Sequence, residues 1–155
     1  MQSFLYKVIH RFIPCKAALH KWNKADTDIC DKCVIRDDIE HFLVKCNLVR
    51  PFWDRFLEWW RTVYDIVINL CVLDTILGIA NPERDDMIYN LNFCLLFGKY
   101  FIYKCKINEK LISFPLFLKE LRNRVEYEKC ILTQDNKIDT FMLKWMPLTQ
   151  SLSEC

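Results

Sequence analysis

Glycine is scarce in this sequence, with 2 residues among 155. Tight Asn-Gly hairpin turns and phosphate-binding loops need glycine at fixed positions, because glycine adopts positive φ freely and lets the backbone approach a ligand closely. The shortage argues against most all-β folds and against most α/β nucleotide enzymes. We therefore expect an all-α protein of a single packed body, which the length also favours.

Long hydrophobic runs are also missing. The most apolar stretch, residues 91–103, is interrupted by Asn92, Gly98 and Lys99, so it predicts a core helix rather than a membrane span. The first residues do not form the apolar core of a signal peptide, because Lys7 breaks the run early. We expect an intracellular chain, nuclear or cytoplasmic, with no membrane partner.

Acidic side chains are absent from the first 24 positions, whereas six of them crowd into residues 26–40. The basic side chains of the first segment are Lys7, Arg11, Lys16, Lys21 and Lys24. Cations release counterions from phosphates, and an exposed Trp22 would stack on unpaired bases, so the segment predicts weak, non-specific binding to RNA or single-stranded DNA. The alternative is that these cations only solvate helix surfaces, and that is the favoured interpretation for a later set, Lys99, Lys104, Lys106 and Lys110.

Apolar spacing predicts helices along most of the chain. Two short ones fall within residues 4–12 and 16–22, and longer ones over 48–67, 81–106 and 113–132. Asn81 before Pro82 and Ser113 before Pro115 are typical start signals for the last two. The remainder, residues 136–155, is expected to be a tail with an apolar patch at 141–145.

Cysteine is the abundant exception, with nine residues. An odd number in an intracellular chain favours metal binding and free thiols over a disulfide framework. Four residues have the spacing C-x2-C-x7-H-x4-C: Cys30, Cys33, His41 and Cys46. Three thiolates and one imidazole complete a tetrahedral zinc site, so we expect one structural Zn²⁺. The alternative is a chance arrangement of abundant residues.

The remaining cysteines and histidines are expected to have packing roles. Thiols in apolar segments are predicted to be core residues: Cys71, Cys94, Cys105 and Cys130. Cys15 is interpreted as a thiol packed beneath the second helix, with an extra metal ligand as the alternative, and Cys155 has no assigned role. His10 and His20 are expected on helix surfaces or in the core rather than as ligands.

Several segments together carry a family resemblance. They are residues 6–14 (YKVIHRFIP), residues 19–21 (LHK), the Cys/His set, residues 50–53 (RPFW), residues 92–106 and the pair Lys144-Trp145. With these the chain resembles, over nearly its whole length, the zinc-binding region that follows the reverse transcriptase of non-LTR (LINE-type) retrotransposons. The starting Met1 then suggests a detached C-terminal piece of such an element.

The resemblance implies a non-catalytic module that contacts RNA and DNA during target-primed reverse transcription, beside the polymerase domain of the parent element. It implies a zinc-binding unit over residues 1–60, a helical region packed on it over 61–135, and the tail. Polymerase activity is not implied, because the pairs Asp37-Asp38 and Asp85-Asp86 lack the aromatic-x-Asp-Asp pattern and are interpreted as negative charge at helix N-termini. We therefore expect no enzyme.

A second function stays open on the residues alone. Phe52, Trp53, Trp59 and Trp60 offer more aromatic surface than one helix stripe buries, since adjacent residues point about 100° apart. One of these rings would then mark a docking patch. In that case the chain is a zinc-stapled helical scaffold for protein–protein docking, a truncated relic without activity of its own.

Overall fold

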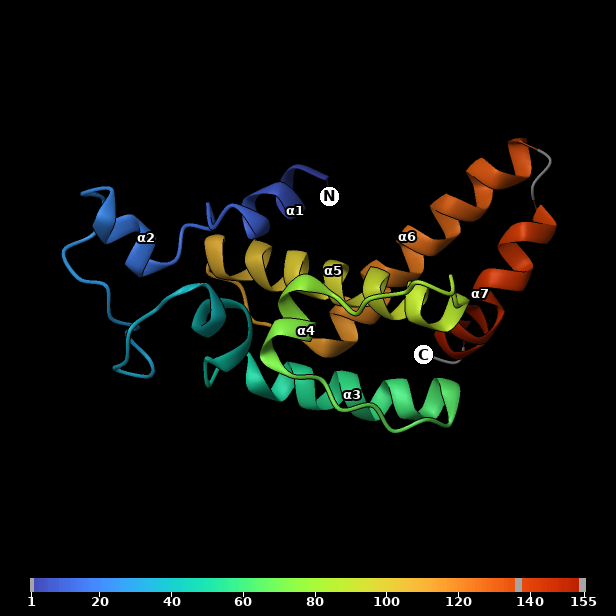
Figure 1. Cartoon of the computed structure of the whole chain (residues 1–155), viewed down its shortest axis with the longest axis horizontal. Coiled ribbons are helices and arrows are strands. Elements are labelled where there is room, and N and C mark those ends of the chain that lie inside the picture. The colour runs from blue at the N-terminus through green and yellow to red at the C-terminus, as the bar shows by residue number, and fades with distance from the viewer. Residues whose placement is uncertain (1, 136–137, 154–155) are drawn as a thin grey trace.

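The computed structural model describes residues 2–135 and 138–153 (Figure 1). In these two ranges the chain forms helices, and its one extended pairing is an isolated bridge between Ile29 and Arg36. The helices are α1 (Gln2–Ile9), α2 (Lys16–Lys21), the π-helical turn η1 (His41–Lys45), α3 (Arg50–Tyr64), α4 (Val72–Leu77), α5 (Asp86–Ile107), α6 (Phe114–Gln134) and α7 (Ile138–Ser153). The expected all-α fold, a Cys/His knuckle followed by a helical bundle, is confirmed.

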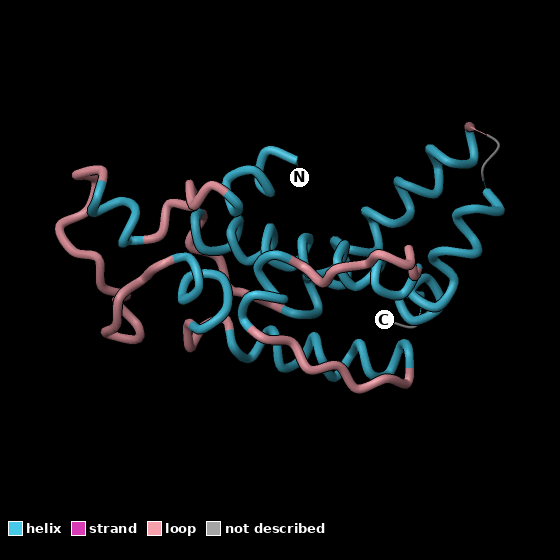
Figure 2. Tube along the Cα trace, viewed as in Figure 1, coloured by secondary structure: helices cyan, strands magenta, loops and turns pink. Residues whose placement is uncertain are grey.

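The long helix α5 runs through the middle of the molecule, and α3 runs in the opposite direction below it (Figure 1). Helices α6 and α7 form a hairpin at one end, where both also contact α3. At the other end lie α1, α2 and the loops that carry the Cys/His set, which Figure 2 shows as the part of the molecule richest in loop. The chain therefore has a helical end and a loop-rich end.

Aromatic side chains of α3 form the centre of the bundle. Phe52, Trp53, Phe56, Trp59 and Trp60 are all buried, so the expectation that one of them marks an exposed docking patch is wrong. One helix stripe is too narrow for these rings, but α3 is covered from more than one side. Trp59 Nε1 donates to Ser151 Oγ of α7 at 3.1 Å, and the Phe52 ring lies 5.1 Å from the ring of Phe117 in α6.

The start of α5 differs from the expectation. The helix begins at Asp86, and the Asp85 side chain accepts from Ile88 N at 3.0 Å. Asn81 does not cap the helix, because its side chain accepts from Asp85 N at 2.8 Å and donates to Asp85 O at 2.7 Å. Asn81 thus closes a turn ahead of the helix, and the predicted Asn81-Pro82 start lies four residues before the observed one. The start of α6 is confirmed, with Ser113 Oγ accepting from Leu116 N at 3.5 Å.

The C-terminal segment is a helix rather than a loose tail. Helix α7 buries Phe141, Trp145, Leu148 and Leu152, and the Trp145 ring lies 5.0 Å from the ring of Phe93 in α5. The predicted apolar patch at 141–145 therefore docks on the bundle. Cys155 and the side chain of Lys144, both named in the sequence-based expectations, lie outside what the structure describes.

Candidate metal centre

The first two candidate ligands, Cys30 and Cys33, lie on one tight turn. Val34 N donates to Cys30 O at 2.9 Å, and Cys30 N donates to Ile35 O at 2.8 Å. Val34 has a φ of 56°, a left-handed conformation that is rare for a β-branched side chain. The closing hydrogen bonds hold this conformation, and the turn brings the two thiols to the same side of the loop.

The other two candidate ligands, His41 and Cys46, are joined by the π-helical turn η1. Asp38 Oδ1 accepts from His41 N at 2.9 Å and starts the turn, and Cys46 N donates to His41 O at 2.9 Å and ends it. This i to i+5 bond is the wide turn of a π-helix, which is often found at functional sites. A separation of five residues therefore returns Cys46 to the level of His41.

The four side chains meet at one point. Their ligand atoms, one from each residue, lie within 4.8 Å of one another, and Cys30, His41 and Cys46 are buried. The Cys33 and Cys46 Sγ atoms are 3.8 Å apart. Two sulfurs bound to one tetrahedral metal at about 2.3 Å are separated by about 3.8 Å. The cluster can therefore hold one metal ion, which confirms the predicted grouping of all four residues.

The imidazole of His41 is oriented by a buried carboxylate. Asp37 Oδ1 lies 2.6 Å from His41 Nδ1, so Nδ1 carries the proton and donates to it. Asp37 is itself fixed, because its Oδ2 accepts from Lys16 N at 3.0 Å. The other ring nitrogen, Nε2, is buried and has no hydrogen-bond partner within the described chain. With the proton on Nδ1, Nε2 has a free lone pair that faces the three thiols, and this lone pair is the one a metal ion would accept.

The thiols ionise to different degrees. The N–H of Asn47 donates to Cys33 Sγ at 3.3 Å and lowers the pKa of Cys33 to about 7, and the neighbouring side chains of His41, Cys46 and Cys30 lower it further. Burial has the opposite effect on Cys46 and raises its pKa. Because a metal binds the thiolate, Cys33 is prepared for ligation near neutral pH, whereas Cys46 needs the charge of the metal to ionise.

Asp37 is the functional residue that the sequence interpretation missed. Its neighbour Asp38 does lie at the start of η1, as expected, but Asp37 points to the histidine ring. The available signal was a carboxylate four residues before a candidate histidine ligand, a spacing that places both side chains on one face of a helical turn.

The other cysteines and histidines lie outside the cluster. Cys15 is buried just before α2, as expected of a packed thiol, and burial raises its pKa. Cys94 and Cys105 are buried as predicted, but the core prediction is wrong for Cys71 and Cys130, which are exposed. Cys71 begins α4, where its Sγ accepts from Asp74 N at 3.3 Å, and Cys130 lies on the outer side of α6. His10 and His20 are at the surface.

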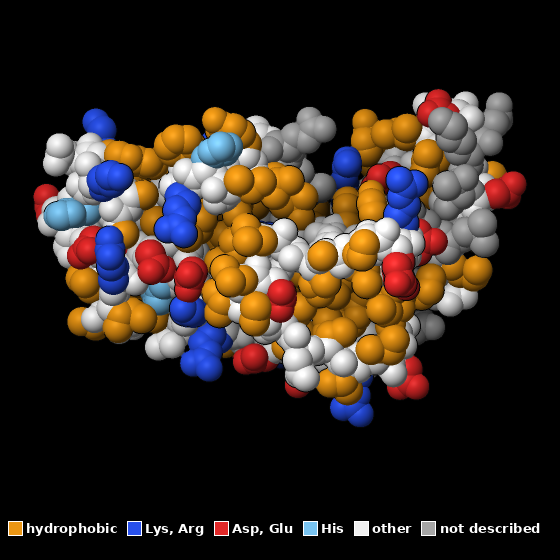
Figure 3. Space-filling model, in the orientation of Figure 1, with side chains coloured by type: hydrophobic (Ala, Val, Ile, Leu, Met, Phe, Trp, Pro, Cys, Tyr) orange, Lys and Arg blue, Asp and Glu red, His pale blue; other side chains and the backbone are white. Residues whose placement is uncertain are grey.

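Among the predicted nucleic-acid residues, Lys16 is joined to the metal centre through Asp31 and Asp37. Lys7, Arg11, Lys21, Trp22 and Lys24 are exposed, whereas Lys16 is half-buried and forms an ion pair with Asp31. The acidic residues of the knuckle have neighbouring cationic partners in Asp28–Arg36 (3.3 Å) and Glu40–Lys45 (2.6 Å). Figure 3 shows lysine, arginine and histidine side chains over this end of the molecule, with acidic ones among them.

Of the later lysines, Lys110 is exposed, whereas Lys99, Lys104 and Lys106 each contact another part of the chain. Lys99 is 2% exposed and donates to Ile76 O, and burial lowers its pKa to about 8. Lys104 pairs with Glu120 at 2.6 Å, and Lys106 donates to Phe42 O at 2.9 Å while lying over the Phe42 ring. The solvating interpretation is therefore wrong for Lys99, and Lys106 instead joins α5 to the metal-binding loop.

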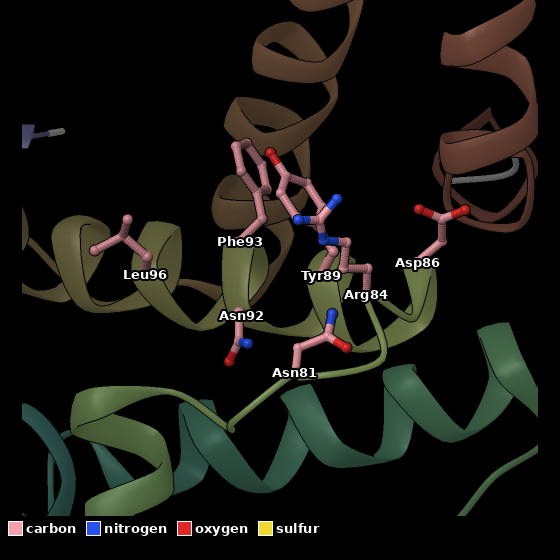
Figure 4. A pocket seen from close by; sticks show the side chains of 7 residues that line it. All are labelled: Asn81, Arg84, Asp86, Tyr89, Asn92, Phe93 and Leu96. Atoms are coloured by element: carbon pink, nitrogen blue, oxygen red, sulfur yellow. The ribbon is translucent and has the colours of Figure 1, made fainter.

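A separate hollow of about 570 Å³ lies at the N-terminal end of α5 (Figure 4). Its lining is Asn81, Arg84, Asp86, Tyr89, Asn92, Phe93 and Leu96. Asn92 points away from Tyr89 and Phe93, and its amide is occupied by the backbone N and O of Ile79, each at 2.7 Å. This hollow is distant from the metal centre, which contacts the opposite end of α5 through Lys106.

Comparison with known proteins adds no relative: no family model, no curated protein and no solved structure matches the chain. Among the helices that the structure describes, none is long and apolar enough to cross a membrane. The resemblance to the retrotransposon zinc-binding region therefore stays a prediction. The chain is a helical protein with a Cys₃His cluster that can hold one metal ion.

Proposed function

We propose that the chain is a non-catalytic zinc-binding module and that its zinc has a structural role. Three thiols and one imidazole are a ligand set that favours zinc over harder cations. The four ligands fill the four positions of a tetrahedral ion, which leaves none open for water or substrate. A bound Zn²⁺ would join the turn that carries Cys30 and Cys33 to the η1 turn, while Asp37 holds the His41 ring in place.

The proposed role of the module is to contact RNA or single-stranded DNA through residues 7–24, beside a reverse-transcriptase polymerase domain as the resemblance implies. The carrying observation is the distribution of charge. Lys7, Arg11, Lys21 and Lys24 are exposed and have no ion pair within the described chain. Of the nearby acids, Asp28, Asp31 and Glu40 are paired, and Asp26 and Asp38 are exposed without an ion pair among the described residues, so cations outnumber acids that are free to repel phosphate. A strand of phosphates would meet free cations there.

The test uses the full zinc-loaded chain and a fluorescent single-stranded RNA in a salt titration. Lys7 and Lys21 are changed together to Gln, and the matched control changes Lys110 and Lys119, which are also exposed. If both residues contact phosphate, the slope of log affinity against log salt falls by about 1.4, since each contact to a single strand contributes about 0.7. The control keeps the original slope.

An affinity that does not change with salt, or no binding at all, would contradict the nucleic-acid role. The zinc-stapled docking scaffold would then be the remaining function. Lys16 is left unchanged in this experiment, because its ion pair with Asp31 and the hydrogen bond of its backbone N to Asp37 connect it to the metal centre.

A further inference from the structure

Helix α1 has two different aromatic faces. On the inner face, Phe4 and Val8 are buried, and the Phe4 ring lies 5.4 Å from Tyr100 and 5.2 Å from Tyr103 of α5. On the outer face Tyr6 is 56% exposed, and His10, four residues later, is also at the surface. The inner ring anchors the helix, so the outer rings are not needed to hold it in place.

Three exposed rings gather on this outer face. The ring centroids of Tyr6 and His10 are 4.2 Å apart, and Phe12 lies 6.4 Å from each of them. The planes of the three rings are within 38° of one another. Phe12 is 50% exposed. At 4.2 Å the rings of Tyr6 and His10 lie face against face, so the three rings form one small stacked cluster, or platform, whose outward side is open to solvent.

The backbone holds Phe12 in this group. Arg11 has a φ of 56°, Arg11 N donates to Val8 O at 3.2 Å, and Phe12 N donates to Lys7 O at 2.7 Å. This pair of bonds is the Schellman ending of a helix, which turns the chain back over its last turn. The next residue, Ile13, is fully buried and fixes the return. The platform is therefore ordered before any ligand binds, which reduces the entropy lost on binding.

Two cationic residues adjoin these rings in the sequence. Lys7 follows Tyr6, Arg11 lies between His10 and Phe12, both cations are exposed, and the sequence has no acidic residue before Asp26. Half-exposed rings with exposed cations next to them in the chain suit a ligand that is both planar and anionic. A protein partner is a poorer fit, because a stable interface needs about 800 Å² from each side, far more than three rings supply.

We propose that Tyr6, His10 and Phe12 form a stacking platform for unpaired nucleobases, with Lys7 and Arg11 contacting the adjoining phosphates. This inference rests on the proposed nucleic-acid role and assigns the ligand class of that surface: a single strand with accessible bases. Stacking on aromatic rings tolerates any base and does not require the 2′-hydroxyl, so RNA and DNA strands of the same sequence should bind alike.

The first experiment compares two ligands on the unmodified, zinc-loaded chain. One is a twelve-nucleotide single-stranded RNA, and the other is a strand of equal length and charge with abasic sites throughout. Loss of stacking by even one base is expected to weaken binding about tenfold at equal salt. Equal affinity for both strands would overturn the platform while leaving the phosphate-binding role intact. Failure to bind either strand would remove the nucleic-acid role itself.

The second experiment locates the effect. Tyr6 and Phe12 are changed together to Leu, which keeps apolar bulk but removes the π faces, and the control is Ile9→Ala at a 57% exposed position of the same helix. The double variant is expected to lose its preference for the base-bearing strand and to keep the salt dependence of the original chain. The control should keep both properties. A double variant that retains the full preference would overturn the assignment.

Discussion

The metal-binding knuckle (residues 28–46) and the helical bundle (α3 to α7) are ordered by different means. The knuckle has short turns, and Val34 and Ile35 of its loop are 79% and 52% exposed. The bundle instead has long helices around buried rings such as Phe56, Trp60 and Phe117. A short loop cannot bury enough apolar surface to offset its conformational entropy, and a metal ion held by the Cys/His cluster would supply a cross-link there.

Two side chains of the bundle connect these regions. Trp53 Nε1 of α3 donates to Leu43 O at 2.8 Å, and Lys106 Nζ of α5 donates to Phe42 O at 2.9 Å. Both carbonyls belong to the η1 turn that carries His41. The bundle therefore positions one side of the knuckle, and we expect the loop from Cys30 to Arg36 to depend on a metal ion bound by the cluster.

The largest expected effect is that of Cys33→Ser. Removing one of four ligands should abolish tight metal binding, a contribution on the order of 10 kcal/mol to the folding of small structural zinc sites. Residues 28–46 are expected to lose protection in amide hydrogen exchange, while α3 and α5 keep theirs. Cys130→Ser, at an exposed thiol outside the cluster, is the control. Unchanged metal content and protection in Cys33→Ser would break the comparison between the two regions.

The converse substitution is Trp60→Ala in the bundle. Trp60 is fully buried, and its ring lies 4.4 Å from that of Tyr64. Its removal should lower the free energy of unfolding by about 3–5 kcal/mol through lost burial and a cavity. Denaturant unfolding followed by circular dichroism measures this change, and mass spectrometry of the folded protein should show the original metal content. A folded Trp60→Ala variant that lost its metal would show that metal binding in the knuckle depends on packing in the bundle core.

Lys99→Met tests whether a buried charge lowers the stability of the bundle. Lys99 is buried and has no carboxylate partner among the described residues. Because the pKa of Lys99 falls from 10.5 to about 8 on folding, the charged form destabilises the protein below pH 8 and this cost disappears above pH 10.5. The stability of Lys99→Met relative to the unmodified protein should therefore shrink by about 3 kcal/mol over that interval. Burial raises the pKa values of Cys94 and Tyr64, so their titration lowers stability as the pH rises. Both proteins contain these two residues, so the difference between their free energies of unfolding reports Lys99 alone. A pH-independent difference would contradict the buried charge.

Asp37→Asn is expected to have the smallest effect. The amide keeps the shape of the side chain but removes the charge that holds the His41 ring. Loss of such an orienting carboxylate typically lowers metal affinity about 10- to 100-fold. Competition with a chromophoric chelator measures the change, and Asp26→Asn, an exposed acid outside the cluster, is the matched control. Equal affinities in both variants would show that Asp37 does not orient the ligand.

The cluster was predictable from the sequence because its ligands lie within 17 positions and the chemistry of Cys and His is specific. The buried stripe of α3 was predictable from helical spacing. The burial of Lys99 was not, because it depends on α4 packing across α5, where the Ile76 carbonyl accepts the hydrogen bond. The start of α5 was also not predictable, since Asn81 and Asp85 are both good caps and the turn between them decides which one begins the helix.

The most direct test is the metal content of the purified chain, measured by native mass spectrometry together with hydrogen exchange before and after chelation. We expect one Zn²⁺ per chain, and we expect chelation to remove the protection of residues 28–46 while α3, α5 and α6 stay protected. A metal-free preparation in which residues 28–46 are already as protected as the helices would contradict a structural zinc site.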